Sequence, residues 1–300
     1  MPVSCSDPAS CLRRRHRALP RRARPWTQRC FRWFSVGAPV RKATSASIPR
    51  RPLPIIPASG PGALPVGRRE PGTSGMAALE ARNLNVTYRK HGKPYTAVHD
   101  LSFTVEVGEV IGFIGPNGAG KSSTIRTLMG FQQPTSGEAR LLGQPAGSRE
   151  ARRQVGFLPE VALYYPWLTP LETLHLYGRL AGLTARESRT QSQELLDRVG
   201  LKGREHDRLR GFSKGMLQRV GIAQSLLGKP RLLILDEVSS GLDPLGRRDL
   251  RNLMLEEKQK GVTIFFSSHE LTEVAQLCDR VILLNKGRVL DERPVDTLLR

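Results

Sequence analysis

A glycine-rich run that ends in a lysine and two serines is the part of this sequence best suited to chemistry. The run is Gly115-Pro116-Asn117-Gly118-Ala119-Gly120-Lys121-Ser122-Ser123, which fits the pattern G-x-x-x-x-G-K-[ST]. It follows an apolar segment, 110–114, and precedes a helical pattern, 124–129, which is the context of a phosphate-binding loop. Its glycines let backbone N–H groups face phosphate oxygens, and the start of the helix adds positive charge. We therefore predict a nucleotide site in which Lys121 reaches the β- and γ-phosphates and Ser122 binds Mg²⁺.

Two acidic residues end a second apolar segment. Asp236 and Glu237 directly follow the aliphatic run 231–235, which predicts a buried parallel strand. Open α/β sheets bind ligands at the carboxyl ends of such strands. In a chain that also has a phosphate loop, we expect Asp236 to hold Mg²⁺ through water and Glu237 to orient and deprotonate an attacking water. Paired acids at a strand end are otherwise often only solvated, so this prediction depends on the phosphate loop.

Three further residues suit a nucleotide site, although each also has a simpler structural interpretation. His269 follows an apolar strand pattern, 262–266, and either hydrogen-bonds a γ-phosphate or is structural. Tyr88 ends an alternating strand pattern and either stacks on adenine or packs in the core. Ser213 begins a helical pattern, where serine is most often an N-cap and sometimes part of an anion site. The residues alone leave these alternatives open.

The patterns around these residues predict the elements that position them. Residues 79–88 and 97–107 alternate apolar and polar side chains, which predicts two antiparallel strands joined by a polar turn at 89–93. These strands indicate a small β-subdomain beside the parallel sheet that carries the glycine-rich run and the acids. Leucines at helical spacing from 169 to about 209, with glycines at the expected helix ends, predict an inserted helical block.

The entrance of the helical block is aromatic. The run 163–168 reads Leu-Tyr-Tyr-Pro-Trp-Leu, and it fits equally well a partly exposed contact with a partner protein or ordinary core packing. With the helical block placed at about 160–211, we predict an α/β domain over 76–300. It would have a parallel-sheet core, an antiparallel β-subdomain and an inserted helical subdomain.

The first 75 residues differ in composition from the rest of the chain. They contain 15 of the 47 Lys and Arg residues and 12 of the 22 prolines, but only two acidic residues, Asp7 and Glu70. Such a segment cannot bury a core, so we predict a disordered leader over 1–75. It fits a basic arm for nucleic acid or anionic lipid, an organelle transit peptide, or sequence upstream of a true start at Met76. We favour the start at Met76, because the predicted strands begin directly after it.

The cysteines follow the same division. Cys5, Cys11 and Cys30 lie in the leader, and only Cys278 lies in the predicted domain. This distribution argues against a disulfide framework and for a reducing compartment. No run approaches the roughly 18 apolar residues that a membrane helix needs, so we do not expect the chain to span a bilayer by itself.

Four motifs in a fixed order make the chain similar to the ATP-binding-cassette (ABC) ATPases. They are GPNGAGKSS, FSKGMLQR, LLILDEVSSGLDP and FSSHE, and the resemblance covers residues 79–297 but not the leader. It implies a P-loop NTPase of the ABC type that binds ATP and Mg²⁺. The second motif, with its Ser-Lys-Gly-Met, looks most like the nucleotide-binding subunits of bacterial ABC-2-type exporters.

The resemblance also implies a dimer of two ATP-binding subunits, either identical or different. Members of this family pair head to tail, and each ATP lies between the phosphate loop of one subunit and the FSKGM signature of the other. Ser213 and Gly215 would thus face the γ-phosphate in the partner's site. The loop 240–243, which ends in Asp243, would link the two sites.

Within one subunit, the resemblance assigns further roles. Tyr88 would stack on adenine, Glu237 would be the general base and His269 would be the switch histidine. Glu160 stands where the family usually has Gln. It adds a negative charge near the metal, and we expect it to ligate Mg²⁺.

We predict from these features the motor subunit of an ABC exporter. ATP binding would close the dimer, hydrolysis would reopen it, and a separate membrane permease would move the substrate. The subunit would be cytoplasmic and peripheral on the inner face of the plasma membrane, with its helical block against the permease. The alternative is a soluble ABC ATPase that acts on ribosomes or DNA, but such proteins usually have two cassettes or a long coiled coil, so we expect no nucleic acid partner. A sensor that binds without turnover is disfavoured, because Glu237 and His269 are both present.

Overall fold

The apolar segment before the glycine-rich run is a central strand of a six-stranded sheet in the computed structural model, which describes residues 77–90, 92–239 and 241–298. The order of the sheet is β10-β9-β3-β8-β7-β6. Its strands are β3 (Val110–Ile114), β6 (Val155–Leu158), β7 (Leu232–Asp236), β8 (Thr263–Ser268), β9 (Arg280–Asn285) and β10 (Arg288–Pro294). All pair in parallel except β10, which is antiparallel to β9. Every residue of β3, β7 and β8 is buried, which explains why these strands are continuous apolar runs.

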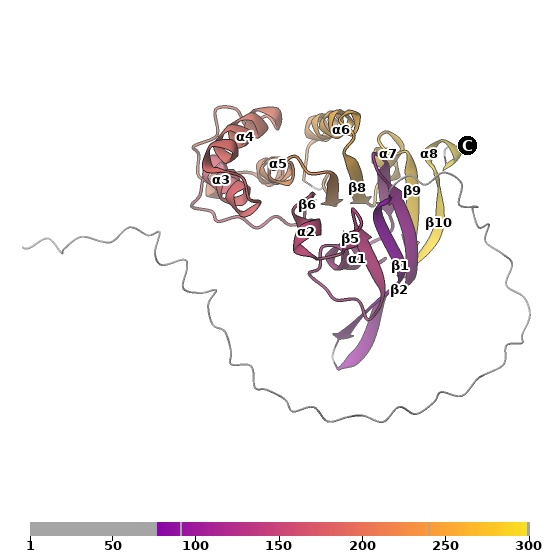
Figure 1. Ribbon diagram of the computed structural model, residues 1–300. Helices are drawn as coiled ribbons and strands as arrows, with labels where there is room; N and C mark the ends of the chain where they lie inside the picture. Colours follow the sequence, from indigo (N-terminus) through magenta and orange to yellow (C-terminus); the bar gives the residue numbers. More distant parts are fainter. Residues whose placement is uncertain (1–76, 91, 240, 299–300) are drawn as a thin grey trace, which may run out of the picture. The chain divides into compact units, whose positions relative to one another are not determined.

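The second sheet has four antiparallel strands in the order β2-β1-β4-β5 (Figure 1). They are β1 (Ala77–Lys90), β2 (Lys93–Glu106), β4 (Ser136–Leu141) and β5 (Gln144–Pro145). The predicted turn at 89–93 is wrong in length, because Arg89 pairs with Pro94 and Lys90 with Lys93. The strands continue past their apolar residues, since ladder hydrogen bonds join backbone groups whatever the side chain is.

The two sheets pack face to face around an aromatic core. The ring centroid of Phe103 in β2 lies 5.7 Å from that of Phe113 in β3 and 5.7 Å from that of Phe265 in β8. The centroids of Phe113 and Phe265 are 5.1 Å apart. Helix α1 (Lys121–Leu128) lies in the same core through Ile125 and Leu128, which are fully buried. Burial of this helix face fixes where the glycine-rich run must turn.

The inserted block consists of α3 (Pro170–Leu180), α4 (Ala185–Arg198) and the short 3₁₀ turn Leu209–Gly211. Both helices begin with a capping box, in which a threonine hydroxyl and a glutamate three residues later satisfy each other's backbone N–H groups. Gly182 and Gly200 follow the helix ends with φ of 97° and 72°, a conformation that favours glycine.

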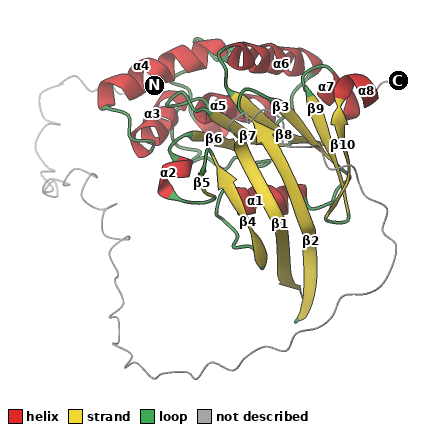
Figure 2. Ribbon diagram, turned by 45° about the vertical axis from the view of Figure 1, so that its right-hand side comes forward, coloured by secondary structure: helices red, strands yellow, loops and turns green. Residues whose placement is uncertain are grey.

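The remaining helices are α2 (Arg149–Arg152), α5 (Lys214–Ser225), α6 (Pro244–Gln259), α7 (Leu271–Ala275) and α8 (Val295–Leu298). Helices α5, α6 and α7 cover the face of the six-stranded sheet that is turned away from the antiparallel strands (Figure 2). The prediction of a parallel-sheet core with an antiparallel β-subdomain and an inserted helical subdomain is confirmed. None of the helices in the described residues is long and apolar enough to cross a membrane. The predicted leader, 1–75, and the start at Met76 lie outside the described residues.

Candidate nucleotide-binding site

The strand register brings the predicted chemical residues to one edge of the six-stranded sheet. Ile114, the last residue of β3, pairs with Ser268 at the end of β8, and Asp236 at the end of β7 pairs with Ser267. The glycine-rich run, Glu237 and His269 therefore leave the sheet at the same edge. This is the edge at which parallel α/β sheets bind ligands.

The glycine-rich run forms a tight turn between β3 and α1. Gly118 and Gly120 have φ of 80° and 108°, and a Cβ at Gly120 would lie 2.6 Å from the carbonyl oxygen of Ala97. A Cβ at Gly115 would lie 2.3 Å from the carbonyl oxygen of Leu284. Helix α1 has no side-chain cap at its N-terminus, so its first N–H groups are available to an anion.

A chain of three charged or titratable side chains crosses the edge. The Nζ atom of Lys121, a buried residue, lies 2.6 Å from the carbonyl oxygen of Gly115 and 3.1 Å from Oε1 of Glu237. Oε2 of Glu237 lies 2.6 Å from Nδ1 of His269, whose ring is half exposed. The carboxylate of Glu237 thus contacts a buried cation on one side and an imidazole open to solvent on the other.

A serine that sequence analysis missed supports both acids. The Ser267 hydroxyl donates to Oδ1 of Asp236 at 2.6 Å and accepts from the backbone N–H of Glu237 at 3.0 Å. Glu237 has φ of 50°, a left-handed conformation that costs a non-glycine residue roughly 1–2 kcal/mol. The polar residues that end the otherwise apolar strand β8 were the available signal for this contact.

A cavity of about 410 Å³ opens beside this edge, within the size range of ligand pockets. It is lined by residues 116–123, Tyr88, Tyr95, Ala97, Glu160 and Glu237. The hydroxyl of Tyr88 is buried and has no hydrogen-bond partner among the described residues. Tyr95, which sequence analysis missed, pairs directly with Tyr88 across the strands and is half exposed. The cavity is therefore lined by two tyrosines of the antiparallel sheet, on β1 and β2.

The predicted signature residues do not line this cavity. Ser213 caps α5, because its hydroxyl accepts from the N–H of Met216 at 3.2 Å. Asp243 caps α6 in the same way through the N–H of Gly246 at 3.0 Å. Gly215 approaches the following loop, since a Cβ there would lie 3.1 Å from the carbonyl oxygen of Gly241. Position 240 of the predicted linking loop lies outside the described residues.

Comparison with known proteins gives the family. The model of the family described as ABC transporter matches residues 98–240. YxlF, an uncharacterised ABC transporter ATP-binding protein of Bacillus subtilis, is 42% identical over 211 residues, which are 70% of this chain and 69% of YxlF. A solved structure of the ATP-binding subunit of an ABC transporter is 34% identical, with a TM-score of 0.67 over 74% of this chain and 91% of that one. This chain belongs to the ABC transporter ATPases.

Other relatives carry names that bear on transport or differ in length. The bacitracin transport ATP-binding protein BcrA of Bacillus licheniformis is 40% identical over 205 residues, 67% of this chain and 66% of BcrA. An uncharacterised ABC transporter ATP-binding protein of Nostoc sp. is 46% identical over 200 residues, 66% of this chain. The chain spans 60% of that protein and 54% of a similar one from Synechocystis.

The residues of this ABC ATPase suit a magnesium nucleotide. No group of three or more His, Cys, Asp or Glu side chains in the described part of the chain is placed to hold a metal ion alone. Mg²⁺ usually keeps several waters and takes one or two carboxylates together with substrate phosphates. Ser122 and Glu160 line the phosphate-loop cavity, and Asp236 directly precedes Glu237, which also lines it.

Proposed function

We propose that this ABC ATPase is the ATP-hydrolysing motor subunit of an exporter that works with a separate membrane permease. The observation that carries the proposal is the chain from Lys121 through Glu237 to His269 beside the phosphate-loop cavity. A buried cation, a carboxylate base and a histidine within hydrogen-bond distance are the groups that phosphoryl transfer to water needs.

The proposed reaction assigns one task to each group. Lys121 and the N–H groups of the phosphate loop bind the β- and γ-phosphates, and Tyr88 stacks on the adenine ring. Ser122, Asp236 through water and Glu160 would hold Mg²⁺, which would neutralise charge on the phosphates. Glu237 takes a proton from a water as that water's oxygen bonds to the γ-phosphorus, and the bond from phosphorus to the ADP oxygen breaks.

His269 completes the proposed site. Its Nδ1 faces Glu237, which leaves the other ring nitrogen for a γ-phosphate oxygen. The contact fixes the direction of the imidazole in the way that a carboxylate orients a catalytic histidine. We therefore assign hydrogen bonding of the γ-phosphate to His269 rather than proton abstraction.

A second ATP-binding subunit would complete each site. Ser213 is exposed at the start of α5, outside the cavity that contains the phosphate loop. A head-to-tail pair would place Ser213 and Gly215 of one subunit against the γ-phosphate held by the other. Whether the second subunit is identical or different is open, because the chain carries all motifs of one full site.

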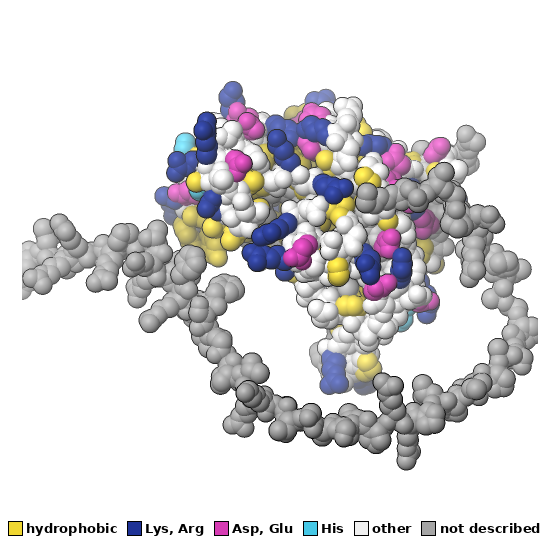
Figure 3. Space-filling view, viewed as in Figure 1, with side chains coloured by type: hydrophobic (Ala, Val, Ile, Leu, Met, Phe, Trp, Pro, Cys, Tyr) yellow, Lys and Arg dark blue, Asp and Glu magenta, His cyan; other side chains and the backbone are white. Residues whose placement is uncertain are grey.

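The permease would contact the aromatic entrance of the helical block. Leu163, Tyr165 and Trp167 are exposed by 85%, 54% and 62%, whereas Tyr164 among them is partly buried and donates to Gln224 of α5 at 2.8 Å. Burial raises the pKa of the Tyr164 hydroxyl, so it stays a neutral donor. Figure 3 shows hydrophobic side chains gathered at the edge of the molecule beside α3 and α4. Such a patch supports an interface with another protein.

The position of this patch supports coupling to the nucleotide. Glu160, which lines the cavity, is three residues before Leu163 in the chain. Backbone hydrogen bonds from Leu209 and Arg210 to Leu168 and Pro166 hold the patch to the end of the helical block. A movement of Glu160 in response to the γ-phosphate would thus be passed to the permease through the few residues between Glu160 and the patch. We place this contact at the inner face of the plasma membrane. The bacitracin transport relative supports export, but the substrate is set by the permease.

The first test is Glu237→Gln in the purified chain. We expect ATP hydrolysis to fall by at least about tenfold, or about 1.4 kcal/mol of barrier, while the Kd for ATP changes by less than about threefold. Hydrolysis that stays within threefold of wild type would make the assignment of the base wrong.

The second test addresses the permease. A tagged chain purified from gently solubilised membranes is expected to retain a polytopic membrane protein, and Leu163→Asp together with Trp167→Ala is expected to release it. Leu290→Asp is the matched control, because Leu290 is also exposed, by 66%, but lies on β10. Retention of ribosomal proteins or DNA, with no membrane protein, would favour the soluble ABC ATPase instead.

A further inference from the structure

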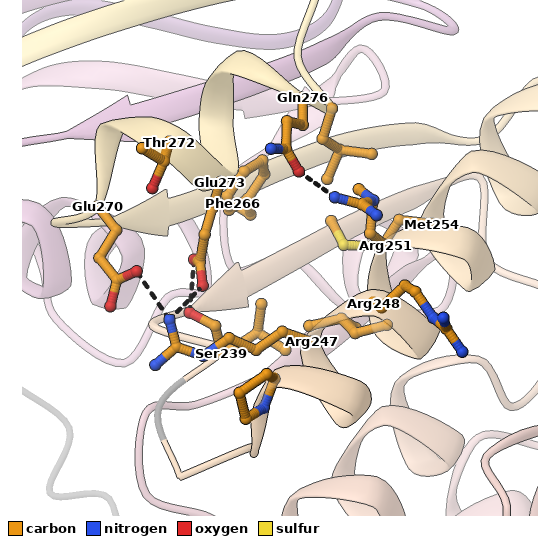
Figure 4. A pocket seen from close by; sticks show the side chains of 14 residues that line it. Ser239, Arg247, Arg248, Arg251, Met254, Phe266, Glu270, Thr272, Glu273 and Gln276 are labelled. Atoms are coloured by element: carbon orange, nitrogen blue, oxygen red, sulfur yellow. Dashed lines mark hydrogen bonds and ion pairs between the residues drawn. The ribbon is translucent and has the colours of Figure 1, made fainter.

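A second polar cluster lies behind the catalytic edge, between α6 and α7 (Figure 4). It lines a cavity of about 320 Å³ whose floor includes Met254 and Phe266. Its centre is the carboxylate of Glu273 in α7, which is mostly buried. None of the roles proposed above involves this cluster.

Glu273 connects the two chain segments that carry the catalytic side chains. Its Oε2 accepts from the hydroxyl of Ser239 at 2.7 Å and from the hydroxyl of Ser268 at 3.4 Å. Ser239 is two residues after Glu237, and Ser268 directly precedes His269. One carboxylate oxygen therefore holds the loop after β7 and the turn after β8.

Arg247 in the first turns of α6 fixes Glu273 from the other side. Its Nη1 lies 3.0 Å from Oε1 of Glu273 and 2.7 Å from Oε2 of Glu270, as the dashed lines of Figure 4 mark. Its Nε also donates to the carbonyl oxygen of Leu242 at 3.4 Å. The guanidinium thus ties α7 to the loop between Glu237 and α6.

The turn after β8 is closed by the same cluster. The backbone N–H of Glu270 donates to the hydroxyl of Ser268 at 3.0 Å, so Ser268 both receives and donates a hydrogen bond. His269 lies between these two residues and has a ring that is half exposed. The His269 ring contacts Glu237, and the cluster holds the residues on both sides of His269.

We propose that Glu273, held in place by Arg247, is a positioning residue that keeps Glu237 and His269 at hydrogen-bond distance. Glu237 has left-handed backbone geometry, which persists only when surrounding contacts hold it. The contact of Ser239 with Glu273 restrains the chain directly after this residue. Loss of Glu273 frees both loops, and a shift of about 1 Å at a catalytic group can cost about 100-fold in rate. This inference rests on the proposed roles of Glu237 and His269.

The test compares variants along one helix of the full-length chain. Glu273→Ala removes the shared acceptor, and we expect kcat for ATP hydrolysis to fall by about tenfold or more while KM changes by less than about threefold. Glu273→Gln keeps an acceptor for Ser239 and is expected to recover part of the rate. Gln276→Ala is the matched control, since Gln276 lines the same cavity but contacts Arg251 instead.

A double-mutant cycle separates positioning from general destabilisation. If Glu273 acts through Ser239, the rate losses of Glu273→Ala and Ser239→Ala will be strongly non-additive, whereas Glu273→Ala and Gln276→Ala will add. A full rate in Glu273→Ala, or equal losses in Glu273→Ala and Gln276→Ala, would overturn the inference. Glu237→Gln, measured in the same series, separates a failure of this inference from a failure of the proposed function. Loss of rate in Glu237→Gln supports the assignment of Glu237 as the base, whatever the result for Glu273.

Discussion

The phosphate-loop cavity and the start of α5 carry the two motifs on which nucleotide chemistry depends, but the structure completes them to different degrees. Around the cavity, Lys121, Glu237 and His269 already contact one another within one chain. At α5, the Ser213 hydroxyl caps its own helix and remains exposed. The residues to which we assign binding and cleavage of ATP are thus in contact within one chain, whereas Ser213, to which we assign contact with the γ-phosphate of a partner's site, is exposed.

This difference indicates which step of the proposed ATP hydrolysis depends on a second subunit. A buried cation and a carboxylate are already in contact within one chain, so we expect a single chain to bind nucleotide. If Ser213 of a second subunit completes the site, as proposed, we expect turnover to depend on that subunit.

The largest loss of ATP hydrolysis is expected from variants that each disable one half of the site. Lys121→Ala and Ser213→Arg are each expected to lower hydrolysis by at least about 100-fold, or about 2.7 kcal/mol of barrier. Only Lys121→Ala should weaken ATP binding by the isolated chain, because Ser213 lies outside its cavity. Equilibrium binding of a fluorescent ATP analogue and steady-state hydrolysis measure the two effects.

Mixing the two variants sharpens the result. A mixed dimer has one site with both halves intact, so an equal mixture should recover about a quarter of the wild-type rate if the sites act independently. Recovery tests the head-to-tail arrangement directly. No recovery, in a mixture shown by mass to contain mixed dimers, would contradict the division between the halves.

A smaller effect is expected at Ser267, which supports Asp236 and Glu237 from beneath. Ser267→Ala removes the hydrogen bond to the Asp236 carboxylate and the one from the backbone N–H of Glu237, and a hydrogen bond to a charged group contributes about 1.5–3 kcal/mol. We expect kcat to fall about tenfold to thirtyfold. Ser225→Ala is the control, because its hydroxyl is equally buried but bonds a carbonyl within α5. That variant should lose stability in thermal unfolding and keep its kcat.

The smallest effect is expected at the aromatic end of the cavity. Tyr88→Ala should raise the Kd for ATP by about tenfold, since stacking of a base on an aromatic ring contributes about 1–3 kcal/mol. Tyr88→Phe should bind nearly as wild type, because the Tyr88 hydroxyl has no partner in the described residues. Tyr95→Ala is the comparison, and a larger loss there would move the stacking assignment to Tyr95.

The parts of the site that the sequence predicts are those whose residue types are rare in combination. Glycines beside Lys121, and an aliphatic run that ends in Asp236 and Glu237, allow few structures other than a phosphate loop and a buried strand. The parallel core followed from the same runs. These features are local, because a few consecutive residues are enough to predict the structure that they form.

The parts that the sequence did not predict depend on contacts between distant residues. Strands β4 and β5 are short and mostly exposed, so they lack the apolar alternation that marks β1. The identity of a residue such as Ser267 does not indicate whether its hydroxyl will bond water or a carboxylate. The meeting of Arg247 with Glu273 joins two helices, and helical spacing shows which face is apolar but not which polar side chains will meet.

The place of β3 within its sheet has a consequence for how the chain is made. Both neighbours of β3, β8 and β9, lie more than 140 residues after it in the chain. The hairpin that follows β9 also donates from the N–H of Gly287 to the carbonyl oxygen of Ala119. A ribosome therefore releases the glycine-rich run long before the strands that must flank it exist. The growing polypeptide cannot form the complete phosphate-binding edge until residues 263–287 have been synthesised.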